Sequence, residues 1–312
     1  MIPTPTTLTP TPAPRRRLTS AARSRLFAVA LLLPAVAVVA LVILYPLLMA
    51  AQMSFYDVKV FRIARGFTGS PHLRNYVDML SSPGFWQSLR VTLYYVFWGT
   101  LGSFAIGLFT AVLLNQPFRG RFLARVLIVL PWPIPGVVAA SIFMWMFNAS
   151  FGVVNYLLLT LGIVSEPVSW FTQPLPALMA VLAATIWKGY PFFTITLLAG
   201  MQSIPGELYE AARVDGASAS QQFRFITIPA LRNVIGISLV ISTLWLFRFF
   251  EVIYIMTGGG PSGATETLSI QIYREAFQYF EMSYAAAIGM VTLLLSVIAT
   301  YLYLRATSRS FY

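Results

Sequence analysis

Six long apolar runs, separated by polar segments, dominate the pattern of this chain. A helix needs about 20 apolar residues to cross the hydrocarbon core of a bilayer. The runs that reach this length occupy Leu26–Met53, Ser88–Leu114, Val126–Phe147, Leu178–Leu198, Val234–Met256 and Tyr284–Leu304. The pattern therefore predicts an all-α membrane protein with six transmembrane helices.

Residues 1–25 differ from the run that follows them. They begin with a Pro/Thr-rich stretch that cannot bury apolar surface, so we expect a disordered cytoplasmic tail. The first apolar run is longer than the roughly 7–15-residue core of a signal peptide, which indicates a retained span. Residues 26–312 are therefore expected to form one transmembrane domain.

The third run contains a cluster of prolines at Pro131, Pro133 and Pro135. Each proline removes a backbone donor and disturbs a regular helix. Two interpretations remain open, a kink that packing tolerates and a hinge used in gating.

The polar segment 204–231 lies between the fourth and fifth runs and is expected to contain two short helices. Pro205 suits the first turn of the first helix, because its missing N–H would have no partner there. Leu208, Ala211 and Ala212 share one small, shallow face at spacings of three and four. Gly216 is expected to end this helix in the left-handed conformation.

A second short helix is predicted to start at Ser218, because Ser218 and Gln221 match the S-x-x-Q capping box. Pro229 is expected to limit this helix, since the residue before a proline avoids helical backbone. The alanine face of the first helix would allow another backbone to approach closely. The alternative is a connector that lies on the membrane surface.

Basic residues are distributed unevenly around the six runs, and loops rich in Lys and Arg face the cytoplasm. With the N-terminus inside, the inner segments carry Arg15, Arg16, Arg17, Arg23, Arg25, Arg119, Arg121, Arg125, Arg213, Arg224, Arg232, Arg305 and Arg309, and the outer segments carry Lys59, Arg62, Arg65, Arg74 and Arg274. This excess predicts that both termini and segment 204–231 are cytoplasmic.

The composition restricts the function. The chain is 58% hydrophobic and 10% charged, against about 25% charged residues in a soluble domain. Its net charge of +11 therefore indicates bases at the ends of membrane spans and not nucleic-acid binding. The chain has no cysteine and one histidine, and it lacks the phosphate-binding pattern G-x-x-x-x-G-K-[ST]. We expect no catalysis, no metal site and no cofactor in this chain.

The polar segment carries one specific motif. Glu210-Ala211-Ala212 is followed after three residues by Gly216 and after nine more by Ile226-x-Ile228-Pro229. This pattern resembles the EAA loop of bacterial ABC importer permeases, with isoleucine at position 228 where leucine is usual. The resemblance implies that the first short helix is a coupling helix that docks on an ATPase subunit. The residues it implies for this role are Glu210, Ala211, Ala212, Asp215, Gly216 and Pro229.

The resemblance extends to two further blocks, residues 187–218 and residues 247–261 with their T-x-G-G-P ending. They are similar to the carbohydrate-uptake branch, the family of the maltose and glycerol-3-phosphate permeases, and to the first permease of each pair. This implies a multi-pass protein of the bacterial inner membrane that imports a sugar or oligosaccharide. It also implies a second homologous permease, an ATPase dimer that binds ATP and Mg, and an extracellular solute-binding protein.

The resemblance also implies a sugar site on the fourth and fifth runs. A sugar needs aromatic platforms and a few hydrogen-bonding groups. The family positions fall on Thr185, Gly189, Phe192, Ser242, Trp245, Leu246 and Phe249. Leu246 and Phe249 replace amides of the family pattern, which argues against maltose itself.

Two intramembrane charges complete the predicted site. Arg248 and Glu251 are three residues apart and are expected to pair on one helix face. They would form a polar wall for sugar hydroxyls, or alternatively a structural pair near the outer end of the helix or facing the second permease. Lys188 has a weaker case, because a long side chain can reach the interface.

Three other functions remain open. The cargo could be a sugar phosphate or another polyol, with Arg248 as the phosphate anchor. A stand-alone secondary transporter or channel would need coupling ions, for which Glu251 is the one candidate acid. An intramembrane enzyme has little support, because the H-E-x-x-H and G-x-S-x-G patterns are missing.

Overall fold

The computed structural model of the 312-residue chain describes residues 20–58 and 70–308. Within these ranges the secondary structure is helical, without a β-strand. The chain divides into two compact units, Met1–Met49 and Ala50–Tyr312. The predicted tail falls almost entirely outside the described residues, as do Lys59, Arg62, Arg65 and Arg309.

Residues 20–53 form one apolar helical run, most of which belongs to the first unit. Helix α1 (Ser20–Val39) continues through a π-helical turn (Ala40–Leu44) into α2 (Tyr45–Met53). Phe27–Met53 is long and apolar enough to cross a membrane, and none of its most hydrophobic stretch is buried. A helix that is apolar all round is suited to lipid or to a partner surface. The apolar helix predicted for the first span is thus confirmed, and it ends at Met53 as predicted.

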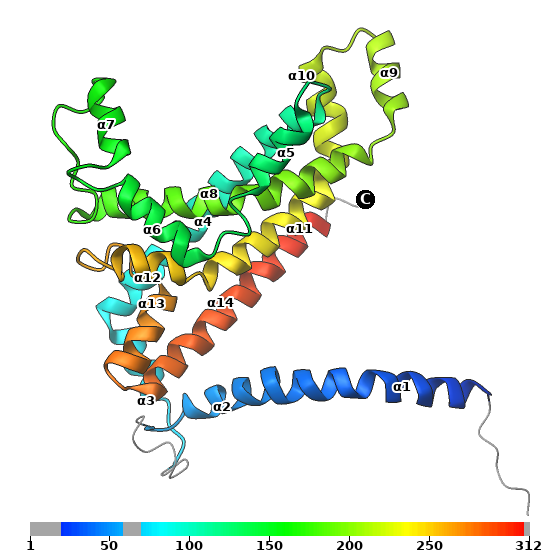
Figure 1. The fold of residues 1–312 in the computed structure, drawn as a ribbon. Coiled ribbons are helices and arrows are strands. Elements are labelled where there is room, and N and C mark those ends of the chain that lie inside the picture. The colour runs from blue at the N-terminus through cyan, green and yellow to red at the C-terminus, as the bar shows by residue number, and fades with distance from the viewer. Residues whose placement is uncertain (1–19, 59–69, 309–312) are drawn as a thin grey trace, which may run out of the picture. The chain divides into compact units, whose positions relative to one another are not determined.

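The second unit contains the remaining helices (Figure 1). They are α3 (Arg74–Ser81), α4 (Pro83–Asn115), α5 (Arg121–Val129), α6 (Gly136–Met146), α7 (Val153–Thr160), α8 (Pro174–Gln202), α9 (Gly206–Val214), α10 (Ala219–Gln222), α11 (Ile228–Phe247), α12 (Glu251–Thr257), α13 (Leu268–Tyr273) and α14 (Met282–Ser308), with π-helical turns at Phe223–Thr227 and Arg274–Gln278.

Five helical stretches of the described chain are long and apolar enough to span a membrane. Besides Phe27–Met53 they are Pro83–Asn115, Pro174–Gln202, Ala219–Phe247 and Met282–Tyr303. The predicted third span is divided, since α5 ends at Val129 and α6 begins at Gly136. The three prolines lie in the interruption, where their missing N–H groups interrupt no helix.

Two other expectations about helix ends are corrected by the structure. The fifth span was expected to run to Met256, but α11 ends at Phe247 and α12 starts only at Glu251. Pro229 was expected to limit the second short helix, but α10 continues through the π-helical turn into α11. Pro229 lies in the first turn of α11, and the wider π-helical turn before it provides the local change in register.

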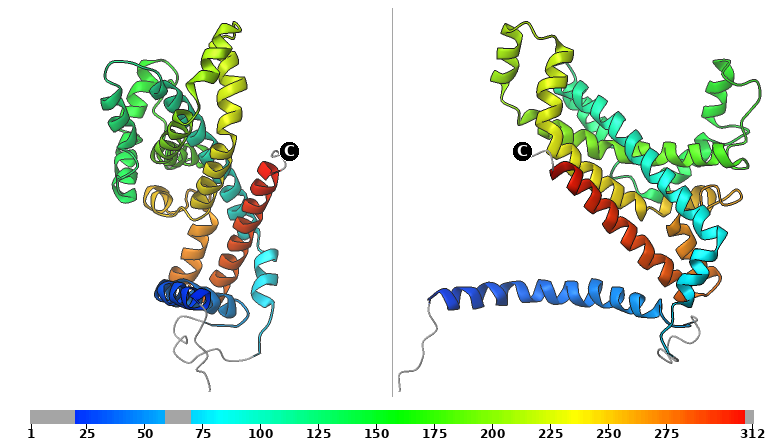
Figure 2. Two further views of the ribbon diagram at one scale, coloured as in Figure 1. Left: turned by 90° about the vertical axis from the view of Figure 1, so that its right-hand side faces the viewer. Right: turned by 180° about the vertical axis from the view of Figure 1, so that it is seen from behind.

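Helices α4 and α8 make the most extensive contact of the second unit and cross each other at an angle in Figure 2. Gly107 makes the approach possible, because a Cβ there would lie 2.9 Å from the backbone oxygen of Tyr190. Thr110 and Thr194 share a 2.7 Å hydrogen bond nearby. Small residues and hydroxyl pairs between helices are typical of packing inside membranes.

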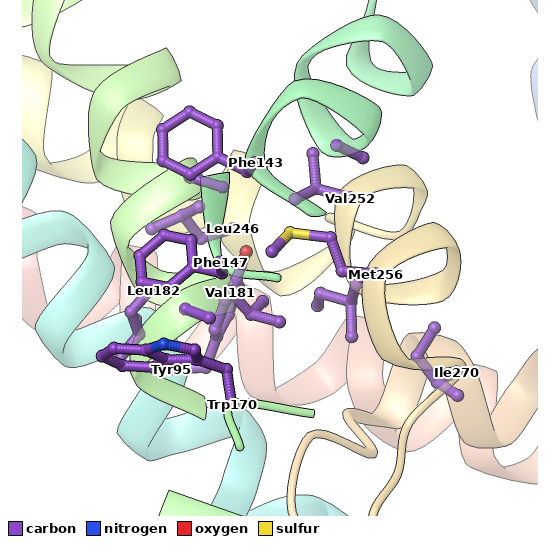
Figure 3. Close-up of a cluster of buried hydrophobic side chains, with 14 of the residues drawn as sticks. Tyr95, Phe143, Phe147, Trp170, Val181, Leu182, Leu246, Val252, Met256 and Ile270 are labelled. Carbon is purple, nitrogen blue, oxygen red and sulfur yellow. The ribbon is translucent and has the colours of Figure 1, made fainter. Parts of the chain in front are cut away.

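A buried apolar cluster joins α4, α6, α8 and α12. Figure 3 shows side chains from these helices meeting, among them Tyr95, Phe143, Val181 and Val252. Phe147 packs edge-on against Trp170 with 4.7 Å between ring centroids. This cluster packs α6, the second half of the divided third span, against the long helices α4 and α8.

Candidate functional site

A cavity of about 110 Å³ lies where α4, α8, α11 and the proline-rich interruption meet. Its lining residues are Ser103, Trp132, Thr185, Lys188, Gly189, Phe192, Ser242, Trp245, Leu246 and Phe249. Seven of them are the uncharged residues that the sequence placed in a sugar site. The structure therefore brings these seven predicted residues together on one cavity.

Helix α8 contributes one face to this cavity. Thr185, Gly189 and Phe192 follow at spacings of four and three, which aligns them on one side of a helix. The hydroxyl of Thr185 donates to the carbonyl of Val181 at 2.8 Å and is 2.6 Å from the hydroxyl of Tyr95. These contacts hold the Thr185 side chain in place, and little of it is accessible.

Glycine at position 189 allows α4 to approach α8. A Cβ at Gly189 would lie only 2.8 Å from the hydroxyl oxygen of Ser103. Ser103 is buried on α4 and lines the same cavity. A larger residue at position 189 would therefore displace Ser103 or close part of the cavity.

Helix α11 supplies the opposite face with Ser242, Trp245 and Leu246. The Trp245 and Phe192 rings lie 4.9 Å apart at an angle of 59°. Leu246 packs over Gly99 of α4, where a Cβ would lie 2.9 Å from the leucine methyl group. The wall is thus aromatic and apolar with a few hydroxyls, a composition that suits a ligand with C–H faces and few polar contacts.

The two predicted charges do not join this cavity. Helix α11 ends before Arg248, so Arg248 and Glu251 do not share a helix face, and no ion pair links these two described residues. Arg248 lines a different cavity of about 640 Å³ between α11, α13 and α14. Glu251 lies against Gly136, where an added Cβ would overlap its carboxylate. The predicted pairing is wrong because the helix is interrupted between the two residues.

Three residues of the cavity were not assigned to the site from the sequence: Ser103, Trp132 and Lys188. Ser103 follows Gly99 at a spacing of four on α4, but small residues at this spacing are frequent in any packed membrane helix. Trp132 lies inside the proline cluster and Lys188 immediately precedes Gly189. The proline cluster was therefore the sequence signal that could have identified Trp132, and Gly189 was the signal that could have identified Lys188.

The second candidate site is the polar segment that contains α9. Gly216 adopts φ of +79°, and Gly216 and Ala217 donate backbone hydrogen bonds to Arg213 and Ala212. This is a Schellman ending, which confirms the predicted left-handed cap. The predicted capping box is also confirmed, since Ser218 accepts from the Gln221 N–H and the Gln221 side chain accepts from the Ser218 N–H.

Helix α9 projects beyond the ends of α8 and α11 (Figures 1 and 2). No residue of α9 is buried, and Val214 is 88% exposed. The hydroxyls of Tyr209 and Thr227 are 2.9 Å apart and link α9 to the π-helical turn. The predicted docking residues are placed as follows: Glu210, Ala211 and Ala212 on α9, Asp215 and Gly216 at its end, and Pro229 exposed at the start of α11.

Comparison with known sequences agrees with these features. The profile of the family described as "Binding-protein-dependent transport system inner membrane component" matches residues 103–310. The chain is 36% identical over 278 residues to the trehalose/maltose transport system permease protein MalF of Thermococcus litoralis, covering 88% of this chain and 91% of that one. It is 36% identical over 282 residues to the sulfoquinovosyl glycerol transport system permease protein SmoG of Agrobacterium fabrum, covering 90% of each.

Comparison with solved structures gives the same assignment of the fold. A chain of a bacterial ABC transporter involved in the import of the acidic polysaccharide alginate matches with a TM-score of 0.80 and 25% identity. The match covers 92% of this chain and 96% of that chain. A second structure of an alginate ABC transporter, in complex with an alginate pentasaccharide-bound periplasmic protein, matches with a TM-score of 0.78.

Proposed function

Because the chain belongs to the family of binding-protein-dependent transport system inner membrane components, we propose that it is the permease subunit of an ATP-driven sugar importer. The chain is a multi-pass inner-membrane protein and a transport subunit without enzymatic activity of its own. The sugar cargo is supported by the relatives for trehalose/maltose and sulfoquinovosyl glycerol and by the alginate transporter. In this proposal a binding protein delivers the solute, in keeping with the family name, and a separate ATPase dimer binds ATP and Mg.

The proposed topology has six crossings, with both termini in the cytoplasm. Helices α5 and α6, which are too short individually, would together make the third crossing. An interruption at membrane depth is acceptable where it is covered by protein or lines a cavity, and Trp132 of this interruption lines the cavity. The distribution of arginines supports the orientation, which places α9 on the cytoplasmic side.

We propose α9 as the coupling helix, and the observation that carries this role is its exposure together with the fixed turn that follows its C-terminal end. The Schellman ending and the capping box fix the turn between α9 and α10, and α10 continues into α11 without a break. A movement of α9 would therefore reach α11, whose Ser242, Trp245 and Leu246 line the cavity. The exposed Val214 and Leu208 provide apolar surface for an ATPase cleft.

Gly216→Ala tests the coupling role. A residue with a Cβ in the left-handed conformation costs about 1–2 kcal/mol, so the substitution should shift the turn and reduce solute imported per ATP hydrolysed about fivefold or more. Gly206→Ala at the other end of α9 is the matched control, because a Cβ there meets nothing within 4 Å and its φ is not positive. Both variants are measured in proteoliposomes containing the full transporter. Unchanged coupling in Gly216→Ala would contradict the role of α9.

The cavity between α4, α8 and α11 is the proposed solute site. Its volume of about 110 Å³ is well below the roughly 300–1,000 Å³ typical of ligand pockets. The proposed second permease would supply the facing wall and complete the space. The sugar-phosphate alternative is less favoured, because Arg248 lines the other cavity and Lys188 donates to two backbone carbonyls.

Trp245→Ala tests the solute site. Loss of the aromatic surface and of the contact with Phe192 should weaken solute handling by roughly two- to tenfold, the equivalent of about 0.5–1.5 kcal/mol for an aromatic pair. Trp145→Ala is the matched control, since Trp145 is 73% exposed on α6 and does not line the cavity. Uptake of labelled trehalose and maltose is measured with and without the ATPase. Equal losses in both variants would remove Trp245 from the solute site, and uptake without the ATPase would favour a stand-alone transporter.

A further inference from the structure

The proline-rich interruption leaves two backbone carbonyls outside the helical hydrogen-bond pattern. Trp132 and Ile134 precede Gly136, where α6 begins, and the first bond of α6 uses the carbonyl of Pro135 as acceptor. Backbone carbonyls within the hydrocarbon region need a donor from the protein, because water is not available there. The carbonyls of Trp132 and Ile134 therefore require a partner from another element.

Lys188 of α8 is that partner. Its ammonium donates to the carbonyl of Trp132 at 3.4 Å and also to the carbonyl of Ile134. The two partners are 56 and 54 residues away in sequence, so the bonds join separate parts of the fold. A charged group inside a membrane protein is costly unless it is paired, and backbone carbonyls are suitable partners.

Glu251 balances the charge from a third element. Its carboxylate lies over Gly136, directly after the interruption, and carries the charge opposite to that of Lys188. Glycine at position 136 is required for this placement, because a Cβ would overlap the carboxylate. The interruption, α8 and the start of α12 thus meet at one polar cluster made of Lys188, Glu251 and the two carbonyls.

This polar cluster lies at the wall of the proposed solute cavity. Lys188 and Trp132 both line the cavity, and so does Phe249, two residues before Glu251. The side chains of Lys188 and Glu251 are otherwise unexplained by the solute site, since the ammonium is engaged by carbonyls and the carboxylate does not line the cavity. Their common effect is to hold the irregular wall against α8.

We propose that Lys188 is a positioning residue that fixes the proline-rich interruption to α8, with Glu251 as its counter-charge, and thereby sets the width of the solute cavity. The inference rests on the proposed function only in taking this cavity as the solute path. The claim that Lys188 sets the width of the cavity concerns the protein alone, so the test of that claim needs neither ATP nor solute.

The test uses a single introduced cysteine, because the chain has none of its own. Ser103→Cys places the thiol on the cavity wall formed by α4, and its rate of reaction with N-ethylmaleimide reports access to the cavity in the assembled transporter. Lys188→Met removes the charge and both donated bonds but keeps an unbranched side chain. We expect it to raise the labelling rate at least about tenfold, because hydrogen bonds from a charged donor are lost. Lys188→Arg, which keeps charge and donors, should stay within about twofold of the unmodified rate.

A second reporter and a second variant keep the test specific. Ser296→Cys lines the separate cavity next to α14, and its labelling should not change in Lys188→Met. If Lys188→Met fails to assemble, Lys188→Met combined with Glu251→Gln removes both charges and leaves neither unpaired. An unchanged Ser103→Cys rate in Lys188→Met or in the double variant would overturn the proposal. Equal rises at both reporters, or equal rises for the Met and Arg variants, would also overturn it.

Failure of this proposal is distinguishable from failure of the proposed function. A labelling change without any effect on sugar uptake would support the positioning role of Lys188 and count against the cavity as the solute path. Altered uptake with unchanged labelling would support the cavity as the solute path and contradict the positioning role of Lys188.

Discussion

The close approach of α4 to α8 predicts a graded response to adding one methyl group at three glycines. At Gly107, a Cβ would lie 2.9 Å from the Tyr190 carbonyl oxygen and 3.1 Å from the Thr194 backbone nitrogen. These backbone atoms cannot rotate away, so α4 and α8 must separate. At Gly102, the nearest atom is the terminal methyl of Ile186, at 2.5 Å, which can move to another rotamer. At Gly289 of α14, a Cβ would meet nothing within 4 Å.

The magnitude follows from two opposed effects. Replacing glycine by alanine inside a helix is favourable by up to about 1 kcal/mol at all three positions. Overpacking costs about 1–3 kcal/mol, and at Gly107 the separation would also stretch the 2.7 Å Thr110–Thr194 hydrogen bond, which contributes about 0.5–1.5 kcal/mol. Gly107→Ala should therefore be about 2–4 kcal/mol less stable than Gly289→Ala, with Gly102→Ala between them.

Thermal unfolding of the purified transporter in one detergent measures this order. With a shift of roughly 2–4 °C per kcal/mol, Gly107→Ala should melt several degrees below Gly289→Ala. Because the three variants carry the same chemical change in helices, helix propensity and detergent effects largely cancel between them. Equal melting temperatures for Gly107→Ala and Gly289→Ala would refute the argument that backbone contact limits the α4–α8 distance.

Two further predictions concern segments outside the long helices. Asn155→Ala should lower the free energy of unfolding by about 2–3 kcal/mol, because the buried side-chain amide forms hydrogen bonds with Ala149, Val168 and Trp170 and its loss leaves these groups unpaired. Thermal unfolding measures this loss, with the exposed Thr160→Ala as the control. A shift in melting temperature no larger than that of the control would contradict the prediction. Burial, together with the nearby carboxylates of Glu266 and Glu281, raises the pKa of Glu275 above 4.5. The folded state therefore binds a proton at Glu275 more readily than the unfolded state does. Above the pKa of the folded state, the ionised carboxylate opposes folding. Glu275→Gln should therefore raise the melting temperature at neutral pH. This gain in melting temperature should shrink as the pH falls through the raised pKa towards 4.5. A gain that does not depend on pH would exclude ionisation of Glu275 as the cause.

Local patterns explain how much of the fold could be predicted from the sequence. The apolar runs locate five spans, because a continuous helix satisfies its own backbone and needs only apolar side chains. The Gly216 ending and the Ser218 capping box are equally local, since each depends on residues within one or two turns. The seven cavity residues were placed through a family resemblance, and six of them lie on α8 and α11, with Phe249 just after the end of α11.

The errors arose where distant elements determine the backbone. The apolar run across Phe247 and Glu251 is interrupted, because α12 turns to pack on α6 and leaves the line of α11. Hydropathy alone does not distinguish a continuous helix from two helices with a bend. The expected pairing of Arg248 with Glu251 on one helix face depended on that continuity, and Arg248 instead lines the cavity between α11, α13 and α14. The contact between Lys188 and Ile134 spans 54 residues and has no local signature.

The two interruptions share a physical reason for their position. Irregular backbone is tolerated at membrane depth only where protein or a cavity satisfies its polar groups. Trp132 of the first interruption and Phe249 of the second line the same cavity, and Glu251 after the second lies on Gly136 after the first. Lys188 donates to the carbonyls of Trp132 and Ile134 in the first interruption, and the Ser269 hydroxyl donates to the Phe247 carbonyl at the second. Without a continuous helix on this wall, the bonds from Lys188 to the Trp132 and Ile134 carbonyls hold the first interruption against α8.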